Sequence, residues 1–475
     1  METQAVWHEE GLRSLREIAA SKLRALGRAL ELPEEMVRAA VDVFDLMSTP
    51  WSAVSAGDRP PWPSDITDDG SPFEFSVALD GRGCELRMLM ESQSLPITAT
   101  SSWDAGLSLQ GRLRDAGLAS LERFQRVQDL FSPPPRSETR FSLWHAAVLT
   151  EAGRPLFKCY LNPASQGKAN APHLVHEALR RLGLDRASDV LAERLSRVAT
   201  PDVRYFALDL DDAESARVKV YVGSSESADE VEALLRTSAN FAPGQATQWL
   251  SALAGRSGPF PERPILCCFA FTAAPAQPTA TLHVPIRCYV DDDEQAARRV
   301  TSLLPPDAAI RLRRTLAAAS DRPLGVGRGL LTYASLRPAA GRLRVTVYLA
   351  PEVYAIAAPR RVTMAMKPIA IRESVDRADA GRVATVRSKL ALLALFLRDV
   401  PRLSSSLSDD AVAADCVDPP SDERGAQAEL AVETDVSAGV LESIESVTAA
   451  MLSLAEELQS LLTSSPLVAR SASAR

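Results

Sequence analysis

The chain has 475 residues, of which 46% are hydrophobic, so it can bury a large core. Its formal net charge of −8 argues against a nucleic-acid backbone or an anionic membrane surface as partner. The acidic first ten residues do not resemble a secretion signal, and the longest apolar run, Leu390–Leu397, is too short to cross a bilayer. We therefore expect a cytoplasmic protein that needs no disulfide framework.

Strand-like hairpins recur along the chain, each with alternating apolar residues and a turn-like break between its halves. The predicted pairs are Phe73–Leu79 with Glu85–Met90, Phe141–Leu149 with Leu156–Leu161, Arg204–Leu210 with Arg217–Val222, Leu266–Phe271 with Leu282–Val290, and Leu330–Leu336 with Leu343–Leu349.

Segments with helical spacing precede or separate these hairpins, and each is long enough for two helices. They are Gly11–Met47, Leu107–Leu130, His173–Val198, Ala228–Leu253 and Asp292–Ala319, the last one broken at Pro305-Pro306. The fold class is therefore α+β. Five ααββ repeats predict a ten-stranded antiparallel β-barrel surrounded by α-helices, because closure removes exposed sheet edges.

The second strand of the later hairpins carries a tyrosine with cationic residues at even offsets before it. Side chains alternate faces along a strand, so these cations and tyrosines share one face. The residues concerned are Lys158 and Tyr160, then Arg217, Lys219 and Tyr221, then Arg287 and Tyr289, then Arg344 and Tyr348, with Arg87 alone in the first hairpin.

On one strand this pattern is more often the solvated face of a sheet. Agreement among five hairpins favours a shared site. The helices need an apolar outer face, so the cations and tyrosines point inward. Such a chamber would bind a multiply charged anion such as a diphosphate, and its rings would stabilise a carbocation.

These residues resemble the dimethylallyltryptophan synthase family of aromatic prenyltransferases, whose fold is the ααββ prenyltransferase (PT) barrel. The resemblance covers roughly residues 5 to 355. Its marks are the runs 71–76 (SPFEFS), 85–87 (ELR), 158–160 (KCY) and 217–221 (RVKVY), and the strand of Tyr348.

The resemblance implies roles for individual residues. Glu74 would accept a hydrogen bond from an indole N–H, and His145 matches the place of a family residue credited with proton removal. A packed strand histidine is an equally good interpretation of His145. The implied diphosphate ligands are Arg87, Lys158, Arg217 and Lys219, and Arg287 and Arg344 join them because they share the same strand face. The implied shield is Tyr160, Tyr221, Tyr289 and Tyr348, joined by Tyr333.

The implied reaction transfers a dimethylallyl group from dimethylallyl diphosphate to an indole ring of tryptophan or a tryptophan-derived compound. Diphosphate leaves, a ring carbon captures the allyl cation, and a base removes the ring proton. The resemblance implies that the reaction needs no metal and no cofactor, and the chain has no DDxxD motif of the kind found in magnesium-dependent prenyl synthases. The expected partners are small molecules, and a homodimer is compatible with the sequence.

Three alternatives stay open. The same fold could prenylate another aromatic acceptor, such as a tyrosine or a phenol. A non-catalytic barrel could bind an isoprenoid diphosphate. An interaction scaffold could act through the C-terminal part of the chain.

The barrel pattern ends near residue 355. We expect a helical extension over 356–403, a disordered linker rich in Ser, Asp, Glu, Ala and Pro over 404–437, and a heptad helix and tail over 438–475. The heptad positions are Val440, Ile444, Val447, Met451, Leu454, Leu458 and Leu461.

Overall fold

The computed structural model describes residues 13–360, except 81–82, 136, 138, 140, 150–153, 199–201, 274–276, 340 and 355. The linker predicted over 404–437 and the heptad helix predicted over 438–475 lie outside the described residues. So does all but the start of the predicted helical extension.

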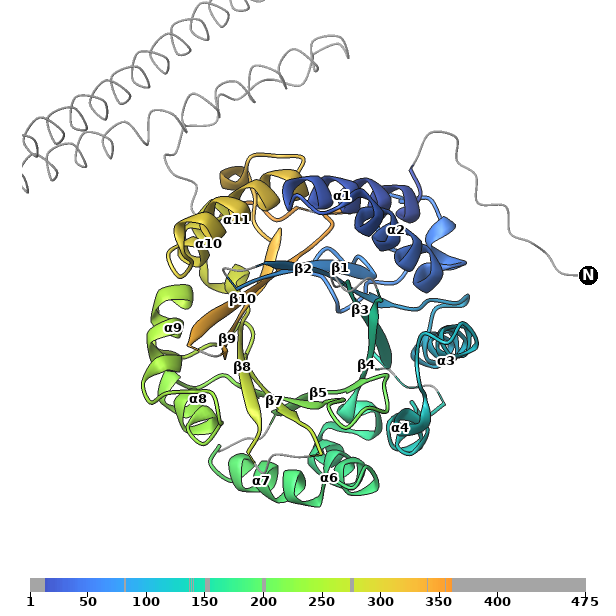
Figure 1. Ribbon diagram of the computed structural model, residues 1–475, viewed down its shortest axis with the longest axis vertical. Coiled ribbons are helices and arrows are strands. Elements are labelled where there is room, and N and C mark those ends of the chain that lie inside the picture. Colours follow the sequence, from blue (N-terminus) through green and yellow to red (C-terminus); the bar gives the residue numbers. More distant parts are fainter. Residues whose placement is uncertain are drawn as a thin grey trace, which may run out of the picture. The chain divides into compact units, whose positions relative to one another are not determined.

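Ten antiparallel strands form a closed barrel in which each strand pairs with its neighbours in the chain and β1 pairs with β10 (Figure 1). The strands are Phe73–Leu79 (β1), Cys84–Glu91 (β2), Leu143–Leu149 (β3), Leu156–Leu161 (β4), Asp202–Asp209 (β5), Val218–Ser224 (β6), Ile265–Phe271 (β7), Thr279–Val284 (β8), Leu331–Ala339 (β9) and Arg342–Leu349 (β10). The predicted fold class is confirmed.

Helices form an outer ring around the strands (Figure 1). They are Leu15–Ala29 (α1), Glu34–Ser48 (α2), Ala99–Asp115 (α3), Glu122–Gln125 (α4), Gln128–Phe131 (α5), Ala171–Arg181 (α6), Asp185–Leu195 (α7), Ala228–Leu235 (α8), Gln245–Ala254 (α9), Asp293–Thr301 (α10) and Pro306–Ala319 (α11). The predicted break at Pro305-Pro306 separates α10 from α11. Within the described residues no helix is both long and apolar enough to cross a bilayer.

The main core lies between the outer face of the barrel and the helices. On β1, Phe73 and Phe75 are 0% and 2% exposed and pack against Phe44 of α2, with ring centroids 5.1 and 6.4 Å apart. The intervening residues Glu74 and Ser76 point to the other face, since side chains alternate along a strand. Burial of the apolar face against the helices thus fixes which side chains enter the barrel.

The main departure from the predicted strands concerns the fourth hairpin. We expected one strand over 282–290, but β8 ends at Val284 and a 3-10 turn follows over Ile286–Tyr289. Pro285 separates the two, and proline cannot donate a ladder hydrogen bond. The apolar alternation continues through this proline, which is why the sequence pattern suggested a longer strand.

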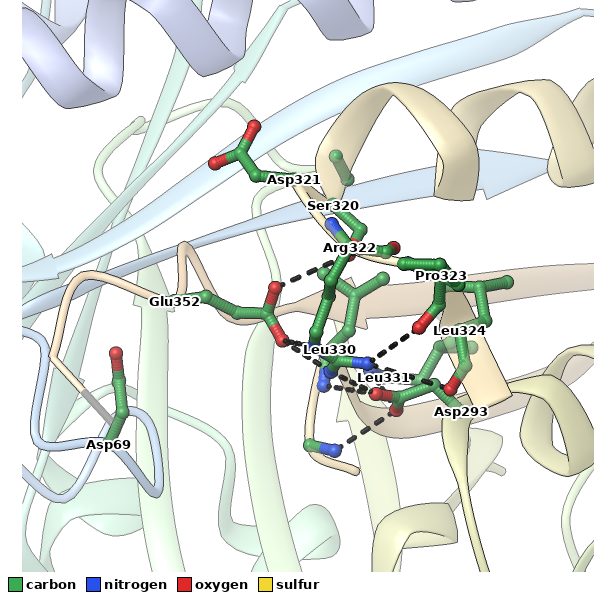
Figure 2. A network of polar contacts seen from close by, with 12 residues as sticks. Asp69, Asp293, Ser320, Asp321, Arg322, Pro323, Leu324, Leu330, Leu331 and Glu352 are labelled. Carbon is green, nitrogen blue, oxygen red and sulfur yellow. Dashed lines mark hydrogen bonds and ion pairs between the residues drawn. The ribbon is translucent and has the colours of Figure 1, made fainter. Parts of the chain in front are cut away.

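A buried carboxylate secures the entry into the fifth hairpin (Figure 2). Asp293, at the start of α10, is fully buried and accepts hydrogen bonds from the backbone N–H groups of Gly329, Leu330 and Leu331 at 3.0, 3.2 and 3.2 Å. It also pairs with Arg322 at 2.6 Å, and Arg322 in turn pairs with Glu352 beyond β10. This network ties α10 to both ends of the hairpin that closes the barrel.

We predict that Asp293→Asn destabilises the barrel by about 2 kcal/mol or more, because the amide leaves buried backbone donors and Arg322 poorly paired. The matched control is Glu294→Gln. The half-buried carboxylate of Glu294 pairs with Arg313 and Arg298, and its loss should cost less than about 1 kcal/mol. Urea unfolding followed by tryptophan fluorescence measures both. Equal stabilities of the two variants would contradict the proposed importance of Asp293.

Candidate active site

Cationic side chains from several strands line a single cavity inside the barrel. They are Arg87 (β2), Lys158 (β4), Arg217 (just before β6), Lys219 (β6), Arg337 (β9) and Arg344 (β10), which we call the cation cluster. Pairing between neighbouring strands brings these side chains close together inside the barrel. Lys158 lies opposite Asp209 on β5, and Arg344 lies opposite Arg337 on β9.

Two carboxylates partly balance the cation cluster. Asp209 accepts from Arg217 Nε at 2.8 Å and lies 3.9 Å from Lys158 Nζ. Glu85 pairs with Arg87 at 2.7 Å and with Arg344. Burial alone would raise the pKa of Glu85, but the charges of Arg87 and Arg344 outweigh it and lower the pKa to about 2. Both carboxylates are therefore ionised, and an excess of positive charge remains.

This excess destabilises the protonated lysines. Burial, followed by the charges of Lys219 and Arg217, lowers the pKa of Lys158 well below its usual value. Burial lowers the pKa of Lys219 to about 8. Arg337 and Arg344 face each other directly, an unfavourable pairing for like charges. A bound polyanion would relieve all three effects, because it supplies the missing negative charge.

Aromatic rings line the barrel beside the cation cluster. The aromatic belt consists of Tyr160, Tyr205, Tyr221, His283, Tyr333 and Tyr348. From Tyr221, ring centroids lie 6.0 Å away at Tyr160, 5.6 Å at Tyr205 and 5.4 Å at His283. His283 is 5.8 Å from Tyr348, which is 6.3 Å from Tyr333.

The phenols of the belt are held in their neutral form. Burial raises the pKa of Tyr160 to about 12 and raises the pKa of Tyr221 and Tyr348 as well. A neutral phenol presents an electron-rich ring face but is a weaker nucleophile than a phenolate. The belt can therefore stabilise a cation through its ring faces without readily being alkylated by it.

Glu74 adds a carboxyl group to the same cavity. It is 5% exposed, and Thr332 Oγ1 donates to its Oε2 at 3.5 Å. Burial raises the pKa of Glu74 to about 8, although Thr332 and Arg263 act in the opposite direction. A carboxyl group that gains its charge near neutral pH can accept a hydrogen bond from a polar group of a bound molecule.

The chain before β1 is held by Asp69. Its carboxylate accepts from the Ser71 N–H and Oγ at 3.1 and 2.7 Å, and from the N–H groups of Val353 and Tyr354 at 2.9 and 3.3 Å. Gly70, with φ of 81°, makes the tight turn between them. Asp69 thus ties the segment that leads into Glu74 to the chain that follows β10.

The structure contradicts the predicted role of His145. His145 pairs with Cys159 and Met90, so it lies on the outer face, whereas its neighbour Ala146 lines the cavity. Its ring is fully buried against α3, where Gln110 Nε2 donates to its Nε2 at 3.2 Å. Burial lowers the pKa of His145 to about 3. It is a packed strand histidine, and the hairpin register places it on the wrong face for chemistry in the chamber.

Arg287 and Tyr289 do not join the cavity either. Because β8 ends before Pro285, both residues lie in the 3-10 turn. Arg287 pairs with Asp68, while the Tyr289 hydroxyl donates to the Arg263 carbonyl at 2.7 Å and its ring packs edge-on against Phe260. Neither belongs to the cavity lining.

The other predicted residues do converge. Glu74 lines the cavity together with Arg87, Lys158, Arg217, Lys219, Arg344, Tyr160, Tyr221 and Tyr348. Tyr333 contacts Tyr348 in the belt.

The sequence analysis missed Arg337, His283 and Tyr205. Arg337 and Tyr205 lie on first strands of their hairpins, where no repeating cation–tyrosine pattern marks them. The available signal was the pairing within each hairpin. Arg337 lies opposite Arg344 and Tyr205 lies opposite Tyr221, so each pair shares one face of the sheet. No group of three or more His, Cys, Asp or Glu residues suited to a metal ion occurs in the part of the chain that the structure describes.

We predict that Arg337→Gln weakens binding of inorganic pyrophosphate by about tenfold or more, because a charge-assisted hydrogen bond contributes about 1.5–3 kcal/mol. Among the described residues nothing accepts a hydrogen bond from the buried Arg337 Nε, which is typical of an anion-binding group. Calorimetric titration measures the affinity. The exposed Arg342→Gln is the matched control, and equal affinities of the two variants would exclude Arg337 from the anion site.

Comparisons with known proteins identify relatives of this chain. The family model of tryptophan dimethylallyltransferase matches residues 48–305. The 6-dimethylallyltryptophan synthase from Micromonospora olivasterospora, solved with DMASPP and Trp, is 30% identical, with a TM-score of 0.68 over 73% of this chain and 100% of that chain.

Two further solved structures are similar. The binary complex of PriB with product diphosphate is 33% identical, with a TM-score of 0.67 over 74% of this chain and 100% of that chain. The 5-dimethylallyl tryptophan synthase from Streptomyces coelicolor, with DMASPP and Trp, is 29% identical, with a TM-score of 0.67 over 75% and 99%. The chain belongs to the tryptophan dimethylallyltransferase family of prenyltransferases.

Proposed function

We propose that the protein transfers a dimethylallyl group from dimethylallyl diphosphate to the indole ring of tryptophan or a tryptophan-derived compound by electrophilic aromatic substitution. The observation that carries this proposal is that the cation cluster, the buried Glu74 and four members of the aromatic belt meet in one cavity, namely Tyr160, Tyr221, His283 and Tyr348. Each of the three suits a different part of such a reaction. The similar structures solved with DMASPP and Trp support the same pair of substrates.

The cation cluster would hold the diphosphate. Arginines offer forked donors to phosphate oxygens and lysines offer compact charge, so the cluster stabilises the negative charge that develops as the carbon–oxygen bond breaks. Burial lowers the pKa of Lys219 to about 8, and the negative charge of a bound diphosphate would hold this lysine protonated.

The aromatic belt would receive the allyl cation. Its rings surround the space beside the diphosphate site, and their negative faces stabilise a delocalised carbocation. Their bulk also keeps water away from the cation, which would otherwise be captured as an alcohol.

Glu74 would orient the acceptor. Its ionised carboxylate accepts a hydrogen bond from the indole N–H, which fixes the ring and increases its electron density. A phenol could also donate to Glu74, but a simple anion-binding barrel would need neither this carboxylate nor the belt.

The protein's own cations would take the place of a metal ion at the diphosphate. We therefore predict that purified protein incubated with dimethylallyl diphosphate and tryptophan in EDTA forms a product heavier by one prenyl unit. Mass spectrometry detects the product, and a panel of tyrosine and simple phenols tests the acceptor. Pyrophosphate binding without turnover of any acceptor would indicate a binding protein, and activity that requires added magnesium would contradict metal independence.

The pH dependence of kcat/KM should follow the ionisation of Glu74. Because its raised pKa leaves the carboxyl neutral below about 8, the hydrogen-bond-accepting form increases with pH. At saturating donor, kcat/KM for tryptophan should therefore rise with pH towards a plateau above about pH 8.

Two variants check this assignment. Glu74→Gln should lower kcat/KM about 10²-fold and remove the rise with pH. Thr332→Val should move the rise to higher pH, because the Thr332 hydrogen bond lowers the pKa of Glu74. A Glu74→Gln variant with nearly full rate and an unchanged profile would exclude this role.

A further inference from the structure

The chamber needs a group that takes the ring proton, and His145 cannot be that group because it lies on the outer face of β3. Most other lining groups are unsuitable. Glu85 is ionised but paired with two arginines, and the lysines would be protonated beside a diphosphate. The belt phenols are neutral and weakly basic, and Glu74 is committed to the indole N–H.

His283 is different from its neighbours. It stands on β8 between Leu266 of β7 and Ser335 of β9, and its side chain lines the cavity. Its ring lies 5.4 and 5.8 Å from those of Tyr221 and Tyr348, so an imidazole occupies one position of a belt otherwise made of phenols. Within the described residues no hydrogen bond engages its ring nitrogens, although the residue is only 8% exposed.

Building on the proposed function, we propose that His283 is the proton acceptor of the prenylation, taking the ring hydrogen at the carbon that has captured the allyl cation. An imidazole nitrogen with a free lone pair, held in the wall beside the cation, is placed for this step by the fold itself. The assignment also gives a chemical reason for an imidazole at a belt position that a phenol could fill.

Binding of the donor would change the basicity of His283 through the charges that surround it. Burial lowers the pKa of His283 to about 3, with Lys219 and Arg87 contributing, so the imidazole is unprotonated. Tyr221, Tyr348 and Ser335 face it from β6, β10 and β9 and carry no charge at neutral pH. When a diphosphate neutralises Lys219 and Arg87, the repulsion of an imidazolium weakens and the imidazole becomes more basic.

The step balances. The carbon–oxygen bond of the donor breaks with its electron pair on the diphosphate, and a π pair of the indole forms the new carbon–carbon bond. The carbon–hydrogen bond pair then returns to the ring, while the proton passes to His283. The imidazolium transfers this proton to the neighbouring diphosphate, which leaves as the hydrogen diphosphate and restores neutral His283.

The test compares tryptophan with tryptophan deuterated on the indole ring. His283→Phe keeps an aromatic ring but removes the lone pair, and we expect kcat to fall about 10²-fold. KM for the donor and affinity for inorganic pyrophosphate should change little. The variant should also show a normal deuterium isotope effect on kcat where the wild-type enzyme shows none, because proton removal becomes rate-limiting.

His283→Tyr is the second variant, since it completes a belt of phenols. If His283 only walls off the cation, His283→Tyr should be active and neither variant should acquire an isotope effect, and this result would overturn the proposal. His145→Gln is the matched control and should keep the wild-type kcat without an isotope effect. Absence of any product from the wild-type enzyme would instead refute the proposed function, so the two failures are distinguishable.

Discussion

Repulsion among buried cations is the constraint on which the chamber depends. The cation cluster is enclosed by a closed sheet and balanced only in part by Asp209 and Glu85. The lowered pKa of Lys158 and of Lys219 reflects burial and this crowding. Buried cations without enough counter-charge are unfavourable, so a polyanionic ligand is the simplest physical explanation of this arrangement. Apolar packing outside the barrel, where the helices cover β1 and the other strands, offsets the free-energy cost of burying these charges.

The chamber separates two tasks in space. In the proposed reaction the cation cluster would stabilise the leaving diphosphate, and the aromatic belt beside it would offer neutral ring faces to the allyl cation. Burial serves both, because it strengthens the electrostatic interaction with an anion and keeps the phenols protonated. Glu74 shows the opposite effect of the same environment, since burial holds its carboxyl neutral until a hydrogen-bond donor or a higher pH favours the charge.

His145 and His283 illustrate how strand position decides chemistry. Both are buried, and burial lowers the pKa of both to about 3. His145 is packed under α3 and bonded to Gln110, whereas His283 contacts the belt phenols and lines the cavity. Only the second can meet a substrate. A shift of one residue along a strand is enough to exchange these roles, because side chains alternate between the two faces.

The sequence by itself determined the repeating ααββ unit, the closed barrel and most of the inward face, because alternation on the second strands of the hairpins places Lys158 with Tyr160 and Lys219 with Tyr221. Only the tertiary structure decided what depends on pairing between distant strands. Arg337 becomes part of the site through its place opposite Arg344. The exclusion of Tyr289 follows from the end of β8 at Pro285. The register between strands is a collective property of the whole sheet, so no single segment of sequence contains it.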